Sequence, residues 1–136
     1  MILVLDTTAL SAAMRLEPEM VRFLESHRPG EIASVPTVEA EIEYGISRLP
    51  SDSKKRALLA AQKEKIFSEI RILPWTSEAS RAFGRIKASL EAAGTPIDDF
   101  DVAAAAIASS HGAGVITANL VHFRRIEGLE SRHWTS

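Results

Sequence analysis

Three aspartates within four positions stand directly before an alanine-rich apolar segment, in the stretch IDDFDVAAAAIASSHGAGVITANL (residues 97–120). Carboxylates that lie close together repel each other, and either protonation or a cation relieves the repulsion. Hard divalent ions such as Mg²⁺ and Mn²⁺ prefer oxygen ligands, and Mg²⁺ usually keeps several waters beside one or two carboxylates. The stretch therefore allows two interpretations: a solvated acidic loop, or the start of a metal-binding helix that includes Asp98, Asp99 and Asp101.

Other polar side chains follow apolar, strand-like runs at both ends of the sequence. In an open α/β sheet, ligands bind outside the carboxyl ends of the strands. The residues expected at such ends are Asp6, Thr7 and Thr8 after the first run, and Thr117 and Asn119 after a later one. We expect the fold to bring them to the same sheet edge as the three clustered aspartates.

A further carboxylate comes from the helix predicted over residues 36–49, whose apolar stripe includes Val38 and Ile42. At about 100° per residue, Glu41 lies roughly 70° from the centre of that stripe. Glu39 lies roughly 90° away on the other side and Glu43 roughly 130° away. Glu41 is thus predicted to flank the buried face most closely, while the other two glutamates are expected to be surface charges.

The elements that must position these residues alternate along the chain. Strands are predicted at residues 2–5, 32–35, 70–74 and 114–117, with a fifth near Ile126. Helices are predicted at residues 17–27, 36–49, 53–69, 76–92 and 99–110. Such alternation indicates an α/β fold, an α/β/α sandwich with three layers and a central parallel sheet that carries helices on both faces.

Composition limits the class of protein. The 136 residues suit a single domain spanning 1–136, and 46% hydrophobic with 25% charged residues is typical of a globular chain. Because there is no cysteine, disulfides, thiolate metal sites and a cysteine nucleophile are excluded.

The start MILVLD is too short for a signal peptide and no segment reaches membrane-spanning length, so we expect a cytoplasmic location and no membrane partner. A net charge of −2 offers no basic footprint, so RNA binding would need a cation at the acidic residues.

Four segments resemble, in the right order, the motifs of the PIN-domain ribonucleases, most closely the VapC and FitB-like toxins of toxin–antitoxin pairs. They are VLDTTAL, TVEAEIEYG, PIDDFDVAAAAIA and VITANLVHFRRIEGL. The resemblance aligns the family's acidic positions with Asp6, Glu41 and Asp101, and its fourth polar position with Asn119. Two departures matter: Thr8 stands where Asn or Ser is commoner, and Asn119 carries no charge, which would hold any second metal less firmly.

This resemblance implies a PIN-like, Rossmann-like fold and a metal-dependent RNA endonuclease that hydrolyses the phosphodiester in line. It implies Mg²⁺ or Mn²⁺ at Asp6 and Asp101, and catalysis by these two residues with Glu41 and Asn119. The threonines and the other clustered aspartates are possible supporting residues: Thr7, Thr8, Asp98, Asp99 and Thr117.

The resemblance also implies two protein partners. One is a second copy of the chain, with residues 53–69 and 76–92 as the candidate homodimer contact. The other is a cognate antitoxin that blocks the acidic site, and a partly exposed groove formed by Tyr44, Ile46 and Leu49 beside Glu41 would suit an amphipathic antitoxin helix.

Simpler interpretations stay open at several positions. Asp98 and Asp99 fit N-caps or solvated loop residues, and Asn119 fits a turn cap equally well. His122 and His133 are expected to be structural or surface residues. Receiver, flavodoxin and haloacid-type phosphatase patterns match poorly, which leaves a catalytically degenerate PIN-like domain that binds only protein as the main non-enzyme alternative.

Overall fold

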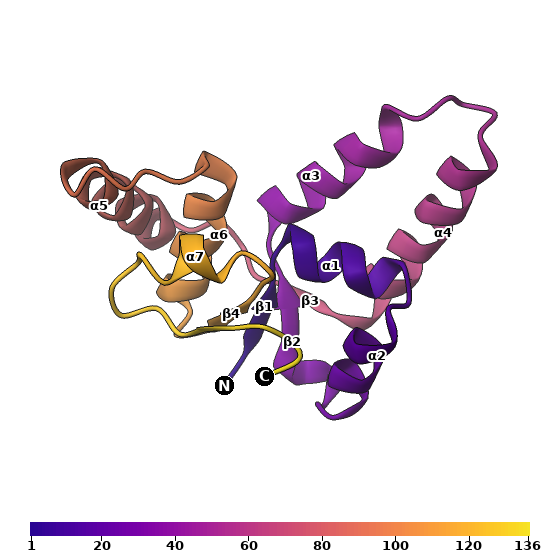
Figure 1. Cartoon of the computed structure of the whole chain (residues 1–136), viewed down its shortest axis with the longest axis horizontal. Coiled ribbons are helices and arrows are strands. Elements are labelled where there is room, and N and C mark those ends of the chain that lie inside the picture. The colour runs from indigo at the N-terminus through magenta and orange to yellow at the C-terminus, as the bar shows by residue number, and fades with distance from the viewer.

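The computed structural model describes residues 1–136 and contains one sheet of five parallel strands in the order β3-β2-β1-β4-β5 (Figure 1). The strands are short: β1 Leu3–Leu5, β2 Ile32–Ser34, β3 Arg71–Ile72, β4 Gly114–Ile116 and β5 Ser131–Arg132. The helices are α1 Thr7–Met14, α2 Pro18–Glu25, α3 Pro36–Ser47, α4 Lys54–Glu69, α5 Ser77–Ala92, α6 Asp99–Ser110 and α7 Leu120–Phe123, with a 3-10 turn η1 at Pro29–Glu31. The predicted three-layer fold with a parallel sheet is confirmed.

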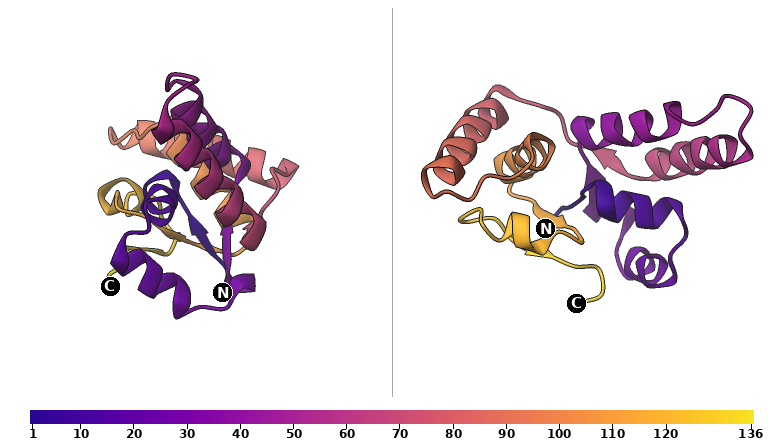
Figure 2. Two further views of the ribbon diagram at one scale, coloured as in Figure 1. Left: turned by 90° about the vertical axis from the view of Figure 1, so that its right-hand side faces the viewer. Right: turned by 45° about the horizontal axis from the view of Figure 1, so that its top comes forward.

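The arrangement places the middle of the sheet at the middle of the molecule. In Figure 1, α3 and α4 extend together to one side of the strands while α5 lies on the opposite side, and the right-hand view of Figure 2 shows the same separation. The central strand β1 pairs with β2 and with β4, so the ends of these strands, although far apart in sequence, lie next to each other.

The hydrophobic core forms where β1 and β4 meet α1 and α6. Both strands are buried along their full length, and α6 buries seven consecutive residues, Val102–Ala108. Five of these seven are alanines, and small side chains let a helix approach its neighbours closely. The predicted buried, alanine-rich helix is therefore confirmed, and its acidic first turn lies at the edge of the core.

Two helices and one strand differ from the predictions. No helix was predicted for α1, because five of its eight residues are buried and a helix buried on most sides lacks a clear amphipathic period. The short helix α7 was also missed. The fifth strand was placed near Ile126, but β5 comes later, at Ser131–Arg132. Ile126 is instead buried in the turn after α7, so its apolar character reflects core packing and not strand pairing.

The outer helix α4 contains no fully buried residue. Leu58, predicted on its apolar side, is 59% exposed, whereas Leu59 and Ile66 pack against the core. No helix of the protein is both long and apolar enough to cross a membrane.

Candidate active site

Asp6 lies at the carboxyl end of β1, where the chain turns into α1, and is only 2% exposed. Its Oδ1 accepts hydrogen bonds from the Thr8 hydroxyl (2.6 Å) and from the backbone N–H of Ala9 (2.9 Å). Its Oδ2 accepts one from the Thr117 hydroxyl (2.5 Å), at the end of the neighbouring strand β4. The buried carboxylate therefore caps α1 and is held both from α1 and from the end of β4.

Glu41 reaches the same region from α3. Its Oε1 accepts a hydrogen bond from the Thr7 hydroxyl at 2.6 Å, which ties α3 to the first turn of α1. The two neighbouring glutamates on this helix, Glu39 and Glu43, instead lie near the ammonium of Lys63, at 3.8 and 2.8 Å. The helical-face argument thus selected the glutamate that faces the site and identified the two that do not.

Asp101 projects from the first turn of α6, and its side chain is 18% exposed. Its Oδ2 lies 3.0 Å from Nδ1 of His122 on α7. The other two aspartates of the cluster have structural roles: Asp98 is the N-cap of α6 and accepts from the Phe100 N–H at 2.8 Å, and Asp99 pairs with Lys87 at 3.0 Å. Of the acidic stretch, Asp101 is bonded to His122 at the site, while Asp98 acts on Glu41 through its charge.

The loop after β4 supplies the fourth side of the site. The Thr117 hydroxyl accepts from the Asn119 N–H at 2.8 Å, and the Thr8 hydroxyl accepts from the Ala118 N–H at 2.9 Å. The Asn119 side chain is exposed and makes no capping hydrogen bond to α7. The turn-cap interpretation of this side chain is therefore wrong, and both threonines connect the loop to Asp6.

Burial and neighbouring charges raise the pKa values of two site carboxylates, Asp6 and Glu41. Burial is the largest cause that raises the pKa of Asp6 above its ordinary value of 3.8, partly offset by the hydrogen bonds from Thr117, Thr8 and Ala9; the charge of Asp101 raises it further. Burial also raises the pKa of Glu41 above 4.5, opposed by the Thr7 hydrogen bond and reinforced by the nearby charges of Asp101, Asp98 and Asp6. The charge of Asp101 thus acts on both Asp6 and Glu41, whereas the convergence of the three carboxylates on one volume stays a prediction.

The donor set is open, because no three acidic or histidine side chains close around a single position that could hold an ion. The oxygens that meet here are hard ligands suited to Mg²⁺ or Mn²⁺. Mg²⁺ is usually held by only one or two carboxylates while waters complete its octahedron, so an open set of this kind is compatible with it.

His122 is the site contact that the sequence did not indicate. It was expected to be structural or on the surface, yet its ring contacts Asp101 across 21 positions of sequence. The only sequence signal for a role of His122 was its position after β4, two residues before a pair of arginines. No helix was predicted for that segment, so the sequence did not show what His122 would contact. The contact depends on α7, which brings the ring to α6.

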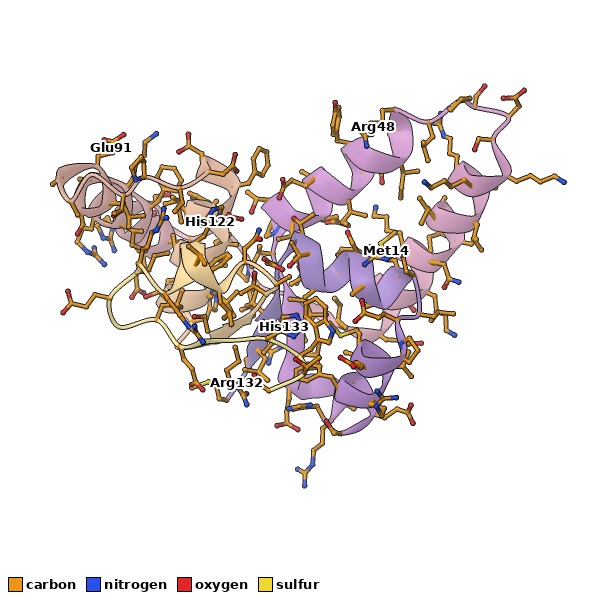
Figure 3. All side chains as sticks on the ribbon, in the orientation of Figure 1. Met14, Arg48, Glu91, His122, Arg132 and His133 are labelled. Carbon is orange, nitrogen blue, oxygen red and sulfur yellow. The ribbon has the colours of Figure 1, made fainter.

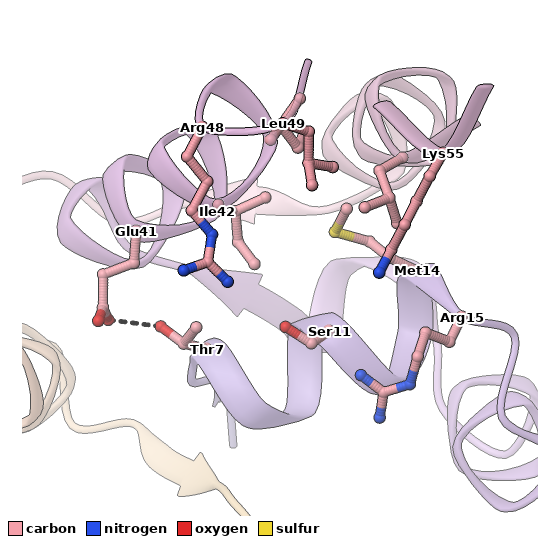
Figure 4. Close-up of a pocket in the computed structure, with 12 residues that line it drawn as sticks. Thr7, Ser11, Met14, Arg15, Glu41, Ile42, Arg48, Leu49 and Lys55 are labelled. Atoms are coloured by element: carbon pink, nitrogen blue, oxygen red, sulfur yellow. Dashed lines mark hydrogen bonds between the residues drawn. The ribbon is translucent and has the colours of Figure 1, made fainter. Parts of the chain in front are cut away.

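A groove of about 350 Å³ adjoins the carboxylates between α1, α3 and α4 (Figure 4). Glu41 and Thr7 stand at one end, and the cationic side chains of Arg15, Arg48 and Lys55 extend into the rest. The remaining lining residues are Ser11, Met14, Ile42, Gly45, Ile46, Leu49 and Leu59. Of the predicted groove residues, Ile46 and Leu49 line it, whereas Tyr44 does not and is 68% exposed.

Comparison with known proteins gives consistent matches along the whole chain. The family model described as "PIN domain" matches residues 3–129. The "tRNA(fMet)-specific endonuclease VapC" of Salmonella typhimurium is 27% identical over 130 residues, 96% of each chain, and "Ribonuclease VapC1" of Rickettsia felis is 32% identical over 128 residues, 94% of this chain and 92% of the relative. A crystal structure of VapBC2 from Rickettsia felis bound to a promoter DNA fragment matches with a TM-score of 0.87, at 26% identity over 98% of this chain and 99% of the other.

Proposed function

The chain belongs to the PIN-domain family, and we propose that it is a metal-dependent endoribonuclease that acts as the toxin of a toxin–antitoxin pair. The observation that carries this proposal is a set of carboxylates held by hydrogen bonds near the carboxyl end of the sheet: Asp6 by Thr8 and Thr117, Glu41 by Thr7, and Asp101 by His122. The relatives named as ribonucleases match this chain from end to end, which supports the same reaction class here. We further propose that residues 1–136 work as one domain in the cytoplasm.

The donor chemistry fits a divalent cation. PIN-domain nucleases generally depend on a divalent metal ion, and we propose Mg²⁺ or Mn²⁺ for this chain. Asp6 and Asp101 would hold the ion: Oδ2 of Asp6 accepts only one hydrogen bond, and Oδ1 of Asp101 accepts none. When bound, such an ion lowers the pKa of a bound water and offsets the charge of the phosphodiester.

The protein residues have distinct tasks in this proposal. Thr8 and Thr117 hold both oxygens of Asp6, so that its carboxylate cannot rotate. Glu41, with its raised pKa and its fixed hydrogen bond to Thr7, is suited to accept a proton from the attacking water. Asn119, exposed beside this network, would contact the substrate or a water at the rim without adding charge.

An RNA cleavage assay tests the proposal. The purified chain should cleave RNA in Mg²⁺ or Mn²⁺, stop in EDTA, and leave 5′-phosphate and 3′-hydroxyl ends. Asp6→Ala should abolish cleavage, while Asp99→Asn serves as a matched control because Asp99 pairs only with Lys87 at the surface. A well-folded wild-type chain with no metal-dependent cleavage would favour the degenerate protein-binding alternative.

The groove beside Glu41 supports an antitoxin as the protein partner. Its apolar floor suits a helix, and a partner Arg or Lys could pair with the carboxylates in place of the metal. A Cβ atom added at Gly45 would meet nothing within 4 Å, and Gly45 lines the groove, so we expect the side chain of Gly45→Leu to occupy the groove. We expect Gly45→Leu to weaken co-purification with the antitoxin, whereas Ala40→Leu, on the exposed part of the same helix, should not.

We also propose a homodimer through α4 and α5, chiefly from the family resemblance. Supporting it, Leu58 on α4 is exposed and Trp75, just before α5, is 42% exposed and packs at an angle on Phe83. Light scattering should give twice the 14.8 kDa chain mass for the wild type. A lower mass for Leu58→Asp or Trp75→Lys would locate the contact, and a monomeric wild type would exclude it.

A further inference from the structure

His122 lies on α7 (Figure 3), which packs against α6. Its ring is the only protein group that donates to the side chain of Asp101. The Nδ1–Oδ2 separation of 3.0 Å is that of a hydrogen bond. An ionised carboxylate can only accept, so Nδ1 must carry the proton of this bond. Nε2 makes no hydrogen bond within the protein, and the side chain is 38% exposed.

Each of the three interacting carboxylates has its own donor from a neighbouring element. Thr7 on α1 holds Glu41 on α3, and Thr117 after β4 holds Asp6 after β1. The contact between His122 and Asp101 completes this pattern from α7 to α6. Asp101 differs from the other two in having no hydroxyl donor, so the imidazole alone limits rotation of its carboxylate.

We propose that His122 is a positioning residue for metal binding: it orients the Asp101 carboxylate so that Oδ1, the oxygen without a protein partner, is presented to a divalent cation. This inference rests on the proposed function. Groups that hydrogen-bond to ligating carboxylates commonly change metal affinity by about 10–100-fold when they are removed. His122 occupies that place for Asp101.

A purely structural role for His122, holding α7 against α6, is already filled by its neighbour. Phe123 is fully buried in the core and fixes the same helix, whereas the His122 ring is partly in solvent. Loss of the imidazole should therefore leave the fold intact and change the metal site.

Asparagine provides a matched substitution, because its Nδ2 is attached at the same position as Nδ1 of histidine and also donates a hydrogen bond. Leucine has similar bulk and cannot donate. The measurement is Mn²⁺ binding to the metal-free protein, followed by the electron paramagnetic resonance signal of free Mn²⁺, with no RNA present. We expect His122→Leu to raise the Mn²⁺ dissociation constant about 10–100-fold and His122→Asn to restore most of the affinity.

A double-variant cycle separates positioning from stability. In an Asp101→Asn background, which lacks the carboxylate, His122→Leu should cause no further loss of Mn²⁺ affinity, whereas a structural effect would act equally in both backgrounds. The inference is overturned if His122→Leu binds Mn²⁺ as tightly as the wild type. It is also overturned if His122→Asn binds Mn²⁺ as weakly as His122→Leu and both variants unfold at the same denaturant concentration as the wild type. If the wild type itself binds no Mn²⁺, the proposed function fails instead.

Discussion

Asp6 and Asp101 belong to opposite halves of the carboxylate site, and the protein holds them in different ways. Asp6 directly follows the buried strand β1, and three donors from α1 and from the end of β4 hold its oxygens. Asp101 sits on the first turn of a helix at the rim, with a single imidazole as its partner. Asp6 is thus held by three protein donors and Asp101 by one. We call the half with Asp6 and Glu41 the rigid half, and the half with Asp101 and Asn119 the adjustable half.

Burial explains the difference. A buried carboxylate needs hydrogen bonds because transfer from water is costly, and the strand ends bring donors from both sides of the sequence. At the rim, water can donate hydrogen bonds to the Asp101 carboxylate, so this carboxylate needs fewer protein donors. We infer that the Asp6 half fixes where the cation sits, and that the Asp101 half, with the exposed Asn119, meets the substrate.

Asp6→Asn should have the largest effect on activity. Loss of the central charge should reduce RNA cleavage by more than about 100-fold, the upper end for groups that only support a metal ligand. The metal-free protein should keep its fold or gain stability, because one of three repelling charges is removed. Cleavage rates and urea unfolding measured on the same preparation check both points, and a variant that unfolds would mean that Asp6 is needed mainly as the cap of α1.

Thr117→Val should give the next largest effect, since it removes the buried donor that joins both strands. Asp6 Oδ2 and the Asn119 N–H would lose their partner, at a cost of about 1–3 kcal/mol in the free energy of unfolding. Cleavage should fall about 10–100-fold. Thr37→Val is the matched control, because the Thr37 hydroxyl is buried without a partner and its removal should cost no stability.

The free energy of unfolding of the metal-free protein should depend on pH through the carboxylates of Asp6 and Glu41. The pKa values of Asp6 and Glu41 are raised in the folded state, so between the ordinary and the raised values the folded protein binds more protons than the unfolded chain. The free energy of unfolding should therefore fall as the pH rises from the ordinary values of 3.8 and 4.5 to the raised ones, and then level off.

The measurement is the free energy of unfolding in urea from pH 4 to 8, for the wild type and for the Asp6→Asn, Glu41→Gln double variant. We expect the wild type to lose stability relative to the double variant as the pH rises. Mn²⁺ should reverse that loss at neutral pH in the wild type alone. Parallel curves for the two proteins would mean that the carboxylates are not strained.

Asp98→Ala should affect stability without an equal effect on catalysis. It removes the N-cap of α6 and should cost about 0.5–2 kcal/mol, read from chemical denaturation. Cleavage should stay close to the wild-type rate, because the Asp98 carboxylate is bonded to the Phe100 N–H and acts on Glu41 only through its charge. A loss of activity as large as that of Asp6→Asn would move Asp98 into the catalytic set.

The rigid half of the site was the more predictable from sequence. Asp6 follows a continuous apolar strand, and Glu41 follows from the angle around a regular helix, so local periodicity was enough for both. Asp101 was singled out from its neighbours by the family resemblance, since spacing alone did not separate a cap from a ligand.

The adjustable half was less predictable because its contacts are not local. The partner of Asp101 comes from α7, a helix of only four residues that gives no periodic signal. The late position of β5 and the burial of α1 were missed for a related reason, since tertiary packing and not propensity decides both. Tyr44 shows the same limit: the sequence placed it on the right helix but did not show that its side chain lies outside the groove.

The most direct test of the central claim is whether Asp6, Glu41 and Asp101 act as one unit in Mn²⁺-dependent RNA cleavage. The measurement is the cleavage rate of the wild type, of Asp6→Asn, Glu41→Gln and Asp101→Asn, and of the triple variant, each with its fold checked by circular dichroism. Residues that act as a unit are strongly non-additive, so each single variant should lose nearly as much activity as the triple variant. Losses that simply add, or a single variant that keeps the wild-type rate, would contradict the shared metal site.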